Sequence, residues 1–182
     1  MTRPRVLIPV ALGTNRDNDL ADAFRMAGAD PETVPIADLR TDKRRMSDYQ
    51  ILAVPGGFSY GDDLAAGRVW GSTLRGPLGG ALRTHVERGG RVLGVCNGFQ
   101  VLTEAGLLPG ALQKNAGLKF INDWQMLRVE TTNSALTSAA EVGQSLNIPI
   151  NHFEGNYTCS PETLAELQAN DQIVLTYTPN PN

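Results

Sequence analysis

The sequence predicts an α/β domain built on a doubly wound, mostly parallel β-sheet of the flavodoxin-like type. Three observations indicate this fold: short apolar runs have no polar alternation, helix-like segments separate them, and Gly or Pro follows most of them. Strands without polar alternation are typical of a parallel sheet that helices cover on both faces. We expect residues 1–182 to form a single domain, since this is an ordinary length for one.

Strand-like and helix-like segments alternate through the first two-thirds of the chain. The expected strands are Arg5–Val10, Thr33–Ile36, Gln50–Val54 and Val92–Val95. The expected helices are Asp17–Met26, Leu78–Arg88 and Gly98–Ala105. Ligands of doubly wound sheets bind beyond the carboxyl ends of the strands. The residues that follow Val54 and Val95 are therefore the first places to look for function.

The last third of the chain has a different pattern. Met126–Thr131 and Ser145–Ile150 are predicted strands with no long helix between them, which favours a small antiparallel addition to the sheet. Ser160 is an expected N-cap, with Pro at the first position of a helix that runs to about Gln168. A last strand is expected at Gln172–Tyr177. The chain stops on a turn soon after it, so we expect the C-terminal part of the fold to be missing.

Composition excludes several classes of protein. A net charge of −3 and a pI near 5.4 argue against a nucleic-acid-binding surface. No apolar run has the length of a membrane span or the form of a signal peptide, so we expect a cytoplasmic protein without membrane contact. Two cysteines and the absence of Cys-x-x-Cys and His-x-x-x-His pairs argue against a disulfide scaffold and a zinc site. We expect no metal.

The strongest functional motif is Gly-x-Cys-x-Gly around Cys96, between a predicted strand and a predicted helix. This is the cysteine version of a nucleophile elbow, in which a sharp turn exposes the reactive side chain. The flanking glycines permit the turn, and the helix N-terminus favours a thiolate. The backbone N–H of Asn97 points at the same place and is a candidate oxyanion donor. The alternative is a buried structural cysteine beside a helix-starting glycine.

Two further segments are candidates for the site. Gly56 and Gly57 follow the strand that ends at Val54, and the N–H of Gly57 is a natural second oxyanion donor, although an ordinary Gly-rich loop is the alternative. His152 and Glu154 follow a later strand, and from spacing alone His152 is the candidate base for the thiol, or else a histidine that lines a pocket.

Two residues are expected to have no part in the chemistry. His85 lies among Arg, Thr and Glu residues in a predicted helix, so we expect it to be solvated. Cys159 precedes the helix N-cap with no obvious partner, and we interpret it as structural.

The sequence resembles class I (triad-type) glutamine amidotransferases, and within them the PurQ-like glutaminase subunits of phosphoribosylformylglycinamidine synthase. The resemblance rests on residues 55–62 (Pro-Gly-Gly-Phe-Ser-Tyr-Gly-Asp), 94–100 (Gly-Val-Cys-Asn-Gly-Phe-Gln) and 149–157 (Pro-Ile-Asn-His-Phe-Glu-Gly-Asn-Tyr), and it spans nearly the whole chain. It implies that Cys96 attacks glutamine, forms a thioester and releases ammonia. It also implies oxyanion donors at Gly57 and Asn97 and substrate contacts at Gly56 and Gln100.

The resemblance further implies partners and cofactors. The ammonia would serve the amidination of formylglycinamide ribonucleotide in purine biosynthesis, on a large PurL-like synthetase subunit that uses ATP and Mg, with a small PurS-like subunit in many bacteria. This subunit itself would need no cofactor.

The sequence departs from the family in two places. Phe153 stands where the family has a small residue between His and Glu. The family's catalytic His and Glu belong to a Pro-His-Pro-Glu motif that no residue of this chain matches. Without them only the helix dipole, about 0.3–1 kcal/mol, favours the thiolate. We therefore expect little glutaminase activity from the 182-residue chain itself, either because it is truncated or because it is a pseudo-amidotransferase that only binds the synthetase. A chaperone-like or peptidase-like enzyme with an elbow cysteine is a further alternative.

Overall fold

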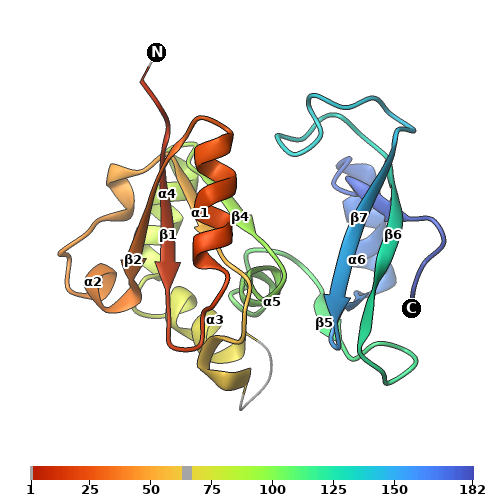
Figure 1. Ribbon diagram of the computed structural model, residues 1–182, viewed down its shortest axis with the longest axis horizontal. Helices are drawn as coiled ribbons and strands as arrows, with labels where there is room; N and C mark the ends of the chain where they lie inside the picture. The colour runs from red at the N-terminus through yellow and green to blue at the C-terminus, as the bar shows by residue number, and fades with distance from the viewer. Residues whose placement is uncertain (1, 63–66) are drawn as a thin grey trace. The chain divides into compact units, whose positions relative to one another are not determined.

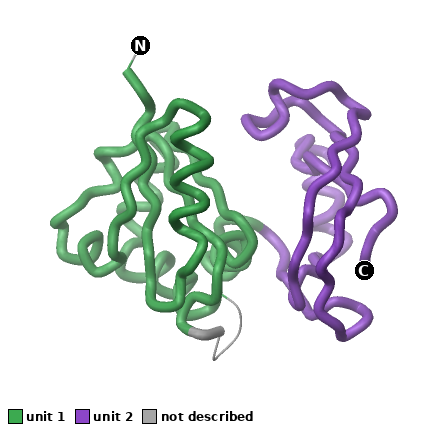
Figure 2. The backbone as a smooth tube through the Cα atoms, in the orientation of Figure 1, with its two compact units in different colours: residues 1–108 green, residues 109–182 purple. Residues whose placement is uncertain are grey.

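The computed structural model describes residues 2–62 and 67–182. The chain divides into two compact units, Met1–Leu108 and Pro109–Asn182, which Figure 2 colours separately. Each unit has its own secondary structure. The expectation of a single domain over residues 1–182 stays a prediction.

A four-stranded parallel sheet forms the centre of the first unit (Figure 1). Its strands are β1 (Arg5–Val10), β2 (Asp30–Pro35), β3 (Ile51–Val54) and β4 (Arg91–Gly94). They lie in the order β2-β1-β3-β4, and every neighbouring pair is parallel. The chain therefore starts in the middle of the sheet and winds first to one edge and then to the other, as the sequence predicts.

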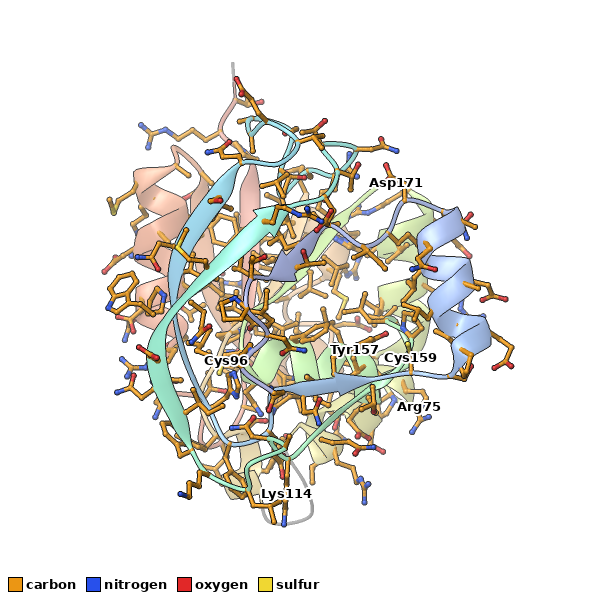
Figure 3. All side chains as sticks on the ribbon, turned by 90° about the vertical axis from the view of Figure 1, so that its right-hand side faces the viewer. Arg75, Cys96, Lys114, Tyr157, Cys159 and Asp171 are labelled. Carbon is orange, nitrogen blue, oxygen red and sulfur yellow. The ribbon has the colours of Figure 1, made fainter. Side chains whose placement is uncertain are left out.

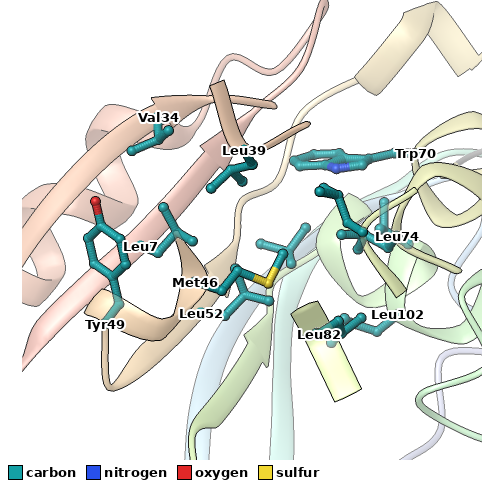
Figure 4. Packing of buried hydrophobic residues seen from close by; sticks show 13 residues of the cluster. Leu7, Val34, Leu39, Met46, Tyr49, Leu52, Trp70, Leu74, Leu82 and Leu102 are labelled. Atoms are coloured by element: carbon teal, nitrogen blue, oxygen red, sulfur yellow. The ribbon is translucent and has the colours of Figure 1, made fainter. Parts of the chain in front are cut away.

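Helices pack on both faces of this sheet. They are α1 (Asp17–Met26), α2 (Ile36–Arg40), α3 (Arg68–Arg75), α4 (Gly79–Glu87) and α5 (Asn97–Glu104), with short 3-10 turns η1 (Met46–Asp48) and η2 (Ser59–Asp62). Val6 and Ile8 pack with Ala21 of α1, whereas Leu7 packs on the other side with Trp70 of α3 and with residues of α4 and α5 (Figure 4). Successive strand residues face opposite sides, so both sets must be apolar. This is why the strands show no polar alternation.

Most predicted elements of this unit are confirmed, with ends that differ by a few residues. The helix α3 was not expected, and its composition explains why. Gly71 lies in the middle of α3, where glycine weakens the helical signal. A β-carbon on Gly71 would lie 2.7 Å from the β-carbon of Glu104, so the glycine allows α3 to approach α5 closely.

The second unit contains two antiparallel sheets. The strands β6 (Ile121–Val129), β7 (Ser145–His152) and β9 (Leu175–Tyr177) form one, in the order β7-β6-β9, and β5 (Ala111–Gln113) pairs with β8 (Asn156–Thr158) in the other. The predicted antiparallel strands are therefore confirmed, and in the described residues they form sheets of their own.

The predicted N-cap of the last helix is also confirmed. The Ser160 hydroxyl accepts a hydrogen bond from the Thr163 N–H at 3.2 Å at the start of α6 (Pro161–Ala169). None of the helices in the described part of the chain combines the length and the apolar character that a membrane crossing requires.

The core of the first unit gives a stability prediction. Leu52 lies in β3 and is completely buried. The substitution Leu52→Ala leaves a cavity and should lower the free energy of unfolding by about 2–5 kcal/mol in urea denaturation. Met26 at the end of α1 is 89% exposed, so Met26→Ala should change it by less than about 0.5 kcal/mol. Equal effects of the two substitutions would contradict the packing described above.

Candidate active site

Cys96 lies on a strained turn between β4 and α5. Its backbone angles are φ 54° and ψ −115°, which residues other than glycine rarely adopt. The side chain is exposed, and α5 begins at the next residue. The Val95 N–H donates to the Val54 carbonyl at 3.1 Å, which continues the pairing with β3 up to the turn. The predicted strand–turn–helix setting of the cysteine is therefore confirmed, and strain of this kind amounts to about 1–3 kcal/mol.

The two glycines beside Cys96 are needed for close packing. A β-carbon on Gly98 would lie 2.0 Å from the Val54 carbonyl oxygen. A β-carbon on Gly94 would lie 2.6 Å from the Gly98 carbonyl oxygen. Positive φ occurs at Cys96 and at neither glycine. The glycines thus allow the first turn of α5 to lie directly on β3, and the cysteine itself takes up the sharp turn.

The Asn97 side chain connects the elbow to the loop after β3. It is 2% exposed, and its Oδ1 accepts hydrogen bonds from the Ser59 hydroxyl at 2.6 Å and the Ser59 N–H at 3.3 Å. Its Nδ2 donates to Gln100 Oε1 at 2.9 Å. The sequence suggested only the backbone N–H of Asn97 as a functional group. The structure adds that its side chain holds both Gln100 and the loop.

The loop after β3 lies against the elbow. A β-carbon on Gly56 would lie 3.2 Å from the β-carbon of Cys96, so Gly56 lies beside the cysteine, as the sequence predicts. Gly57 has φ +125° and forms an isolated bridge with Thr14 in the loop after β1. A β-carbon on Gly57 would lie 2.7 Å from Asn15 Oδ1. The loop after β3 therefore contacts both the loop after β1 and the elbow that carries Cys96.

His152 and Glu154 belong to the second unit, whereas the cysteine belongs to the first. His152 is the last residue of β7, and its Nδ1 lies 2.9 Å from Asn115 Oδ1. Its Nε2 is buried and has no hydrogen-bond partner among the residues that the structure describes. Burial lowers the pKa of His152 below the ordinary value, because it disfavours the charged imidazolium. The side chain of Glu154 is half-buried in the turn that follows β7.

The expectation that His85 is solvated is wrong. Its side chain is 1% exposed, with Nε2 at 3.2 Å from the Arg91 carbonyl oxygen and Nδ1 at 3.3 Å from Arg88 Nη2. Leu78 and Leu82 are also buried, and they precede His85 at helical spacing. This spacing indicates a buried position for His85, although its neighbours in the sequence are polar.

Cys159 lies half-buried beside Tyr157 (Figure 3). The pKa of Tyr157 is raised by burial first and then by Cys159. The structural interpretation of Cys159 stays a prediction.

A cavity of about 250 Å³ lies elsewhere in the first unit. Residues of η1 and α4 line it, together with Arg44 and Arg45, and none of the predicted site residues does. Among the described residues no group of three or more His, Cys, Asp or Glu side chains is placed to hold a metal ion.

Comparison with known proteins places the chain among amidotransferases. Residues 3–182 match the family model of the CobB/CobQ-like glutamine amidotransferase domain. The phosphoribosylformylglycinamidine synthase subunit PurQ of Cereibacter sphaeroides is 51% identical over 170 residues, which cover 93% of this chain and 73% of that protein. The PurQ subunit of Ruegeria pomeroyi is 48% identical over 178 residues, which cover 98% of this chain and 77% of that protein.

Solved structures agree with these relatives. The structure of PurLQS from Thermotoga maritima aligns with 100% of this chain and 77% of its own chain, at a TM-score of 0.83 and 35% identity. A glutamine amidotransferase from Methylobacillus flagellatus aligns with a TM-score of 0.52 at 20% identity, over 88% of this chain and 59% of its own, which shows a common fold.

The strain at Cys96 gives a stability prediction. Glycine usually destabilises a folded chain relative to alanine by about 0.5–1 kcal/mol. At position 96 the order should reverse, because alanine keeps the β-carbon that opposes a positive φ. We expect Cys96→Gly to be more stable than Cys96→Ala by about 1 kcal/mol in urea denaturation. At Val86 of α4, the matched control, Val86→Ala should be more stable than Val86→Gly. The usual order at both positions would disprove the strained turn.

The burial of His152 gives a pH prediction. A nuclear magnetic resonance titration should give a pKa below the ordinary 6.5, with the signal assigned by its loss in His152→Gln. The unfolded chain then binds the proton at a higher pH than the folded chain does. The stability that His152 contributes is therefore complete above about pH 6.5 and is lost as the pH falls through the folded pKa. A measured pKa above 6.5 would contradict the burial.

Proposed function

The chain belongs to the CobB/CobQ-like glutamine amidotransferase family, and we propose that it acts as the glutaminase component of a phosphoribosylformylglycinamidine synthase. It would hydrolyse glutamine and supply the ammonia for amidination of formylglycinamide ribonucleotide in purine biosynthesis. The observation that carries this proposal is the exposed Cys96 on its strained turn, with Gly56 packed against it. The PurQ subunits at 48–51% identity support the choice of synthase.

The proposed reaction proceeds through a thioester. The Cys96 thiolate adds to the side-chain carbonyl carbon of glutamine, and the carbonyl electron pair moves onto oxygen. When that oxyanion collapses, the C–N bond breaks and the nitrogen leaves as ammonia after it takes up a proton. Water then adds to the thioester and the C–S bond breaks, which releases glutamate and regenerates the thiol. No residue of this chain is assigned as the base that moves these protons.

The oxyanion and the substrate would be held by the residues around the elbow. The N–H of Asn97 is at the positive end of α5 next to the nucleophile, which supports it as one oxyanion donor. Gly57 is the second candidate, because it follows Gly56 in the loop that meets Cys96. The hydrogen bond from Asn97 to Gln100 supports Gln100, with Gly56, as a substrate contact.

The ammonia would be used by a second protein. A large PurL-like synthetase subunit is the proposed partner, and ATP and Mg would act there and not in this subunit. The alignment of the whole chain with the Thermotoga maritima PurLQS structure supports this partner, and a small PurS-like subunit is proposed with it. We propose the cytoplasm as the location, where such a complex meets its soluble substrates.

Covalent labelling tests the proposed nucleophile. An electrophilic diazo-ketone analogue of glutamine should label Cys96 in the protein bound to its synthetase, and excess glutamine should protect the thiol. The variant Cys159→Ala is the matched control and should label normally, whereas Cys96→Ala should not label. Labelling that persists in Cys96→Ala would refute the assignment.

A coupled assay tests the proposed pathway. In the complex with the synthetase, Cys96→Ala should abolish glutamine-dependent amidination and leave amidination from added ammonium salt intact, because the synthetase site is unchanged. Loss of both activities or retention of both would contradict the proposed function.

A further inference from the structure

Ser59 joins the loop after β3 to the turn that carries the thiol. It is 3% exposed and begins η2, two residues after Gly57. Its hydroxyl donates to Asn97 Oδ1 at 2.6 Å, and its backbone N–H donates to the same atom at 3.3 Å. Asn97 directly follows Cys96 in the chain. A buried serine therefore connects the loop of one candidate oxyanion donor with the residue that supplies the other.

The two donors of Ser59 determine how the Asn97 amide is oriented. A backbone N–H can only donate, so the atom that faces it must be the side-chain oxygen of Asn97. The amide nitrogen then lies on the other side, where it donates to Gln100 Oε1 at 2.9 Å. Because Asn97 is 2% exposed, water is poorly placed to replace a lost partner, and the loss of one is costly. The contact with Ser59 is thus a fixed part of the elbow.

The loop after β3 is held on two sides. The Phe58 N–H donates to the Gly13 carbonyl at 3.2 Å, and the Tyr60 N–H donates to the Leu12 carbonyl at 2.6 Å. These two residues flank Ser59 in the chain, and their bonds attach the loop to the loop after β1. The hydrogen bonds of Ser59 attach it to the elbow instead.

This attachment matters because oxyanion donors act over a narrow range of distances. An N–H stabilises the developing charge when it lies about 2.7–3.1 Å from the oxyanion. The candidate donors belong to different segments, Asn97 to the elbow and Gly57 to the loop. Gly56 lies between the loop and Cys96 but has no side chain that could hold the two together. The link from Ser59 to Asn97 therefore helps to set the separation of the two donors.

We propose that Ser59 is a positioning residue of the candidate active site, which acts through the Asn97 side chain to hold the loop that carries Gly57 against the turn that carries Cys96. The hydrogen bonds themselves are independent of any activity. Their use in oxyanion stabilisation rests on the proposed function.

Steady-state kinetics test this role. In the complex with the synthetase, Ser59→Ala should lower kcat for glutamine-dependent amidination about tenfold and change KM less, because the oxyanion exists in the transition state and not in bound glutamine. Ammonia-dependent amidination should be unchanged. Ser72→Ala, at an exposed serine of α3, is the matched control and should leave both activities unchanged. An unaltered kcat in Ser59→Ala, or a rise in KM alone, would overturn the proposal.

Alkylation with iodoacetamide separates this role from a loss of thiol exposure. The Cys96 thiolate displaces iodide from a saturated carbon, so a C–S bond forms, a C–I bond breaks and no oxyanion develops. In the same complex, mass spectrometry of the Cys96 peptide should therefore give the same alkylation rate for Ser59→Ala as for the unmodified protein. A rate that falls in parallel with kcat would mean that Ser59 acts on the thiol itself, which would contradict the proposal.

A double variant tests whether Ser59 acts through Asn97. The substitution Asn97→Ala removes the side chain and leaves the backbone N–H in place, so kcat should fall in this variant too. Adding Ser59→Ala to it should cause no further fall, because the bond is already lost. Independent effects that multiply would refute the link. If Asn97→Ala did not fold, the kcat of Ser59→Ala would still decide the matter. Failure of the proposed function would be distinct, because the unmodified protein would then lack glutamine-dependent activity.

Discussion

The site depends on the contact between the first turn of α5 and the end of β3. A side chain on Gly98 would collide with the Val54 carbonyl oxygen, so only glycine lets the helix begin so close to the strand. The chain must then turn sharply between Val95 and α5, and Cys96 makes that turn with φ 54°. Exposure of the thiol, its place at a helix N-terminus and its proximity to Gly56 all follow from this close approach.

A strained nucleophile requires a rigid frame, and the first unit provides one. The strain of about 1–3 kcal/mol at the turn persists only where surrounding contacts leave no alternative. Val54 at the end of β3 and Val101 of α5 are completely buried, and the Asn97 side chain connects the turn to Ser59. The same hydrogen bonds position Gln100. Apolar packing and these hydrogen bonds therefore both hold the turn at Cys96 in place.

The sequence predicted the elements that local patterns encode. Apolar runs located β1 and β3, and Gly-x-Cys-x-Gly between a strand and a helix located the elbow at Cys96. It did not reveal the hydrogen bonds of Asn97 with Ser59 or of Asn115 with His152, which join residues 38 and 37 positions apart. Such pairs form only once the chain has folded, and the sequence around Asn97 or Asn115 does not indicate which residue each will contact. His85 is buried because it shares helical spacing with Leu78 and Leu82, and its charged neighbours in the sequence do not indicate this.

The two histidines illustrate how fixed hydrogen-bond partners can decide side-chain chemistry. In a neutral imidazole ring either nitrogen can carry the hydrogen. The Arg91 carbonyl oxygen places it on Nε2 of His85, and the Asn115 side-chain oxygen places it on Nδ1 of His152. The Arg88 guanidinium faces the remaining nitrogen of His85, whereas Nε2 of His152 has no partner in the described part of the chain. An unsatisfied buried acceptor costs about 1–3 kcal/mol. The Trp70 indole N–H is likewise buried without a partner among the described residues, so the fold bears such a cost at more than one place.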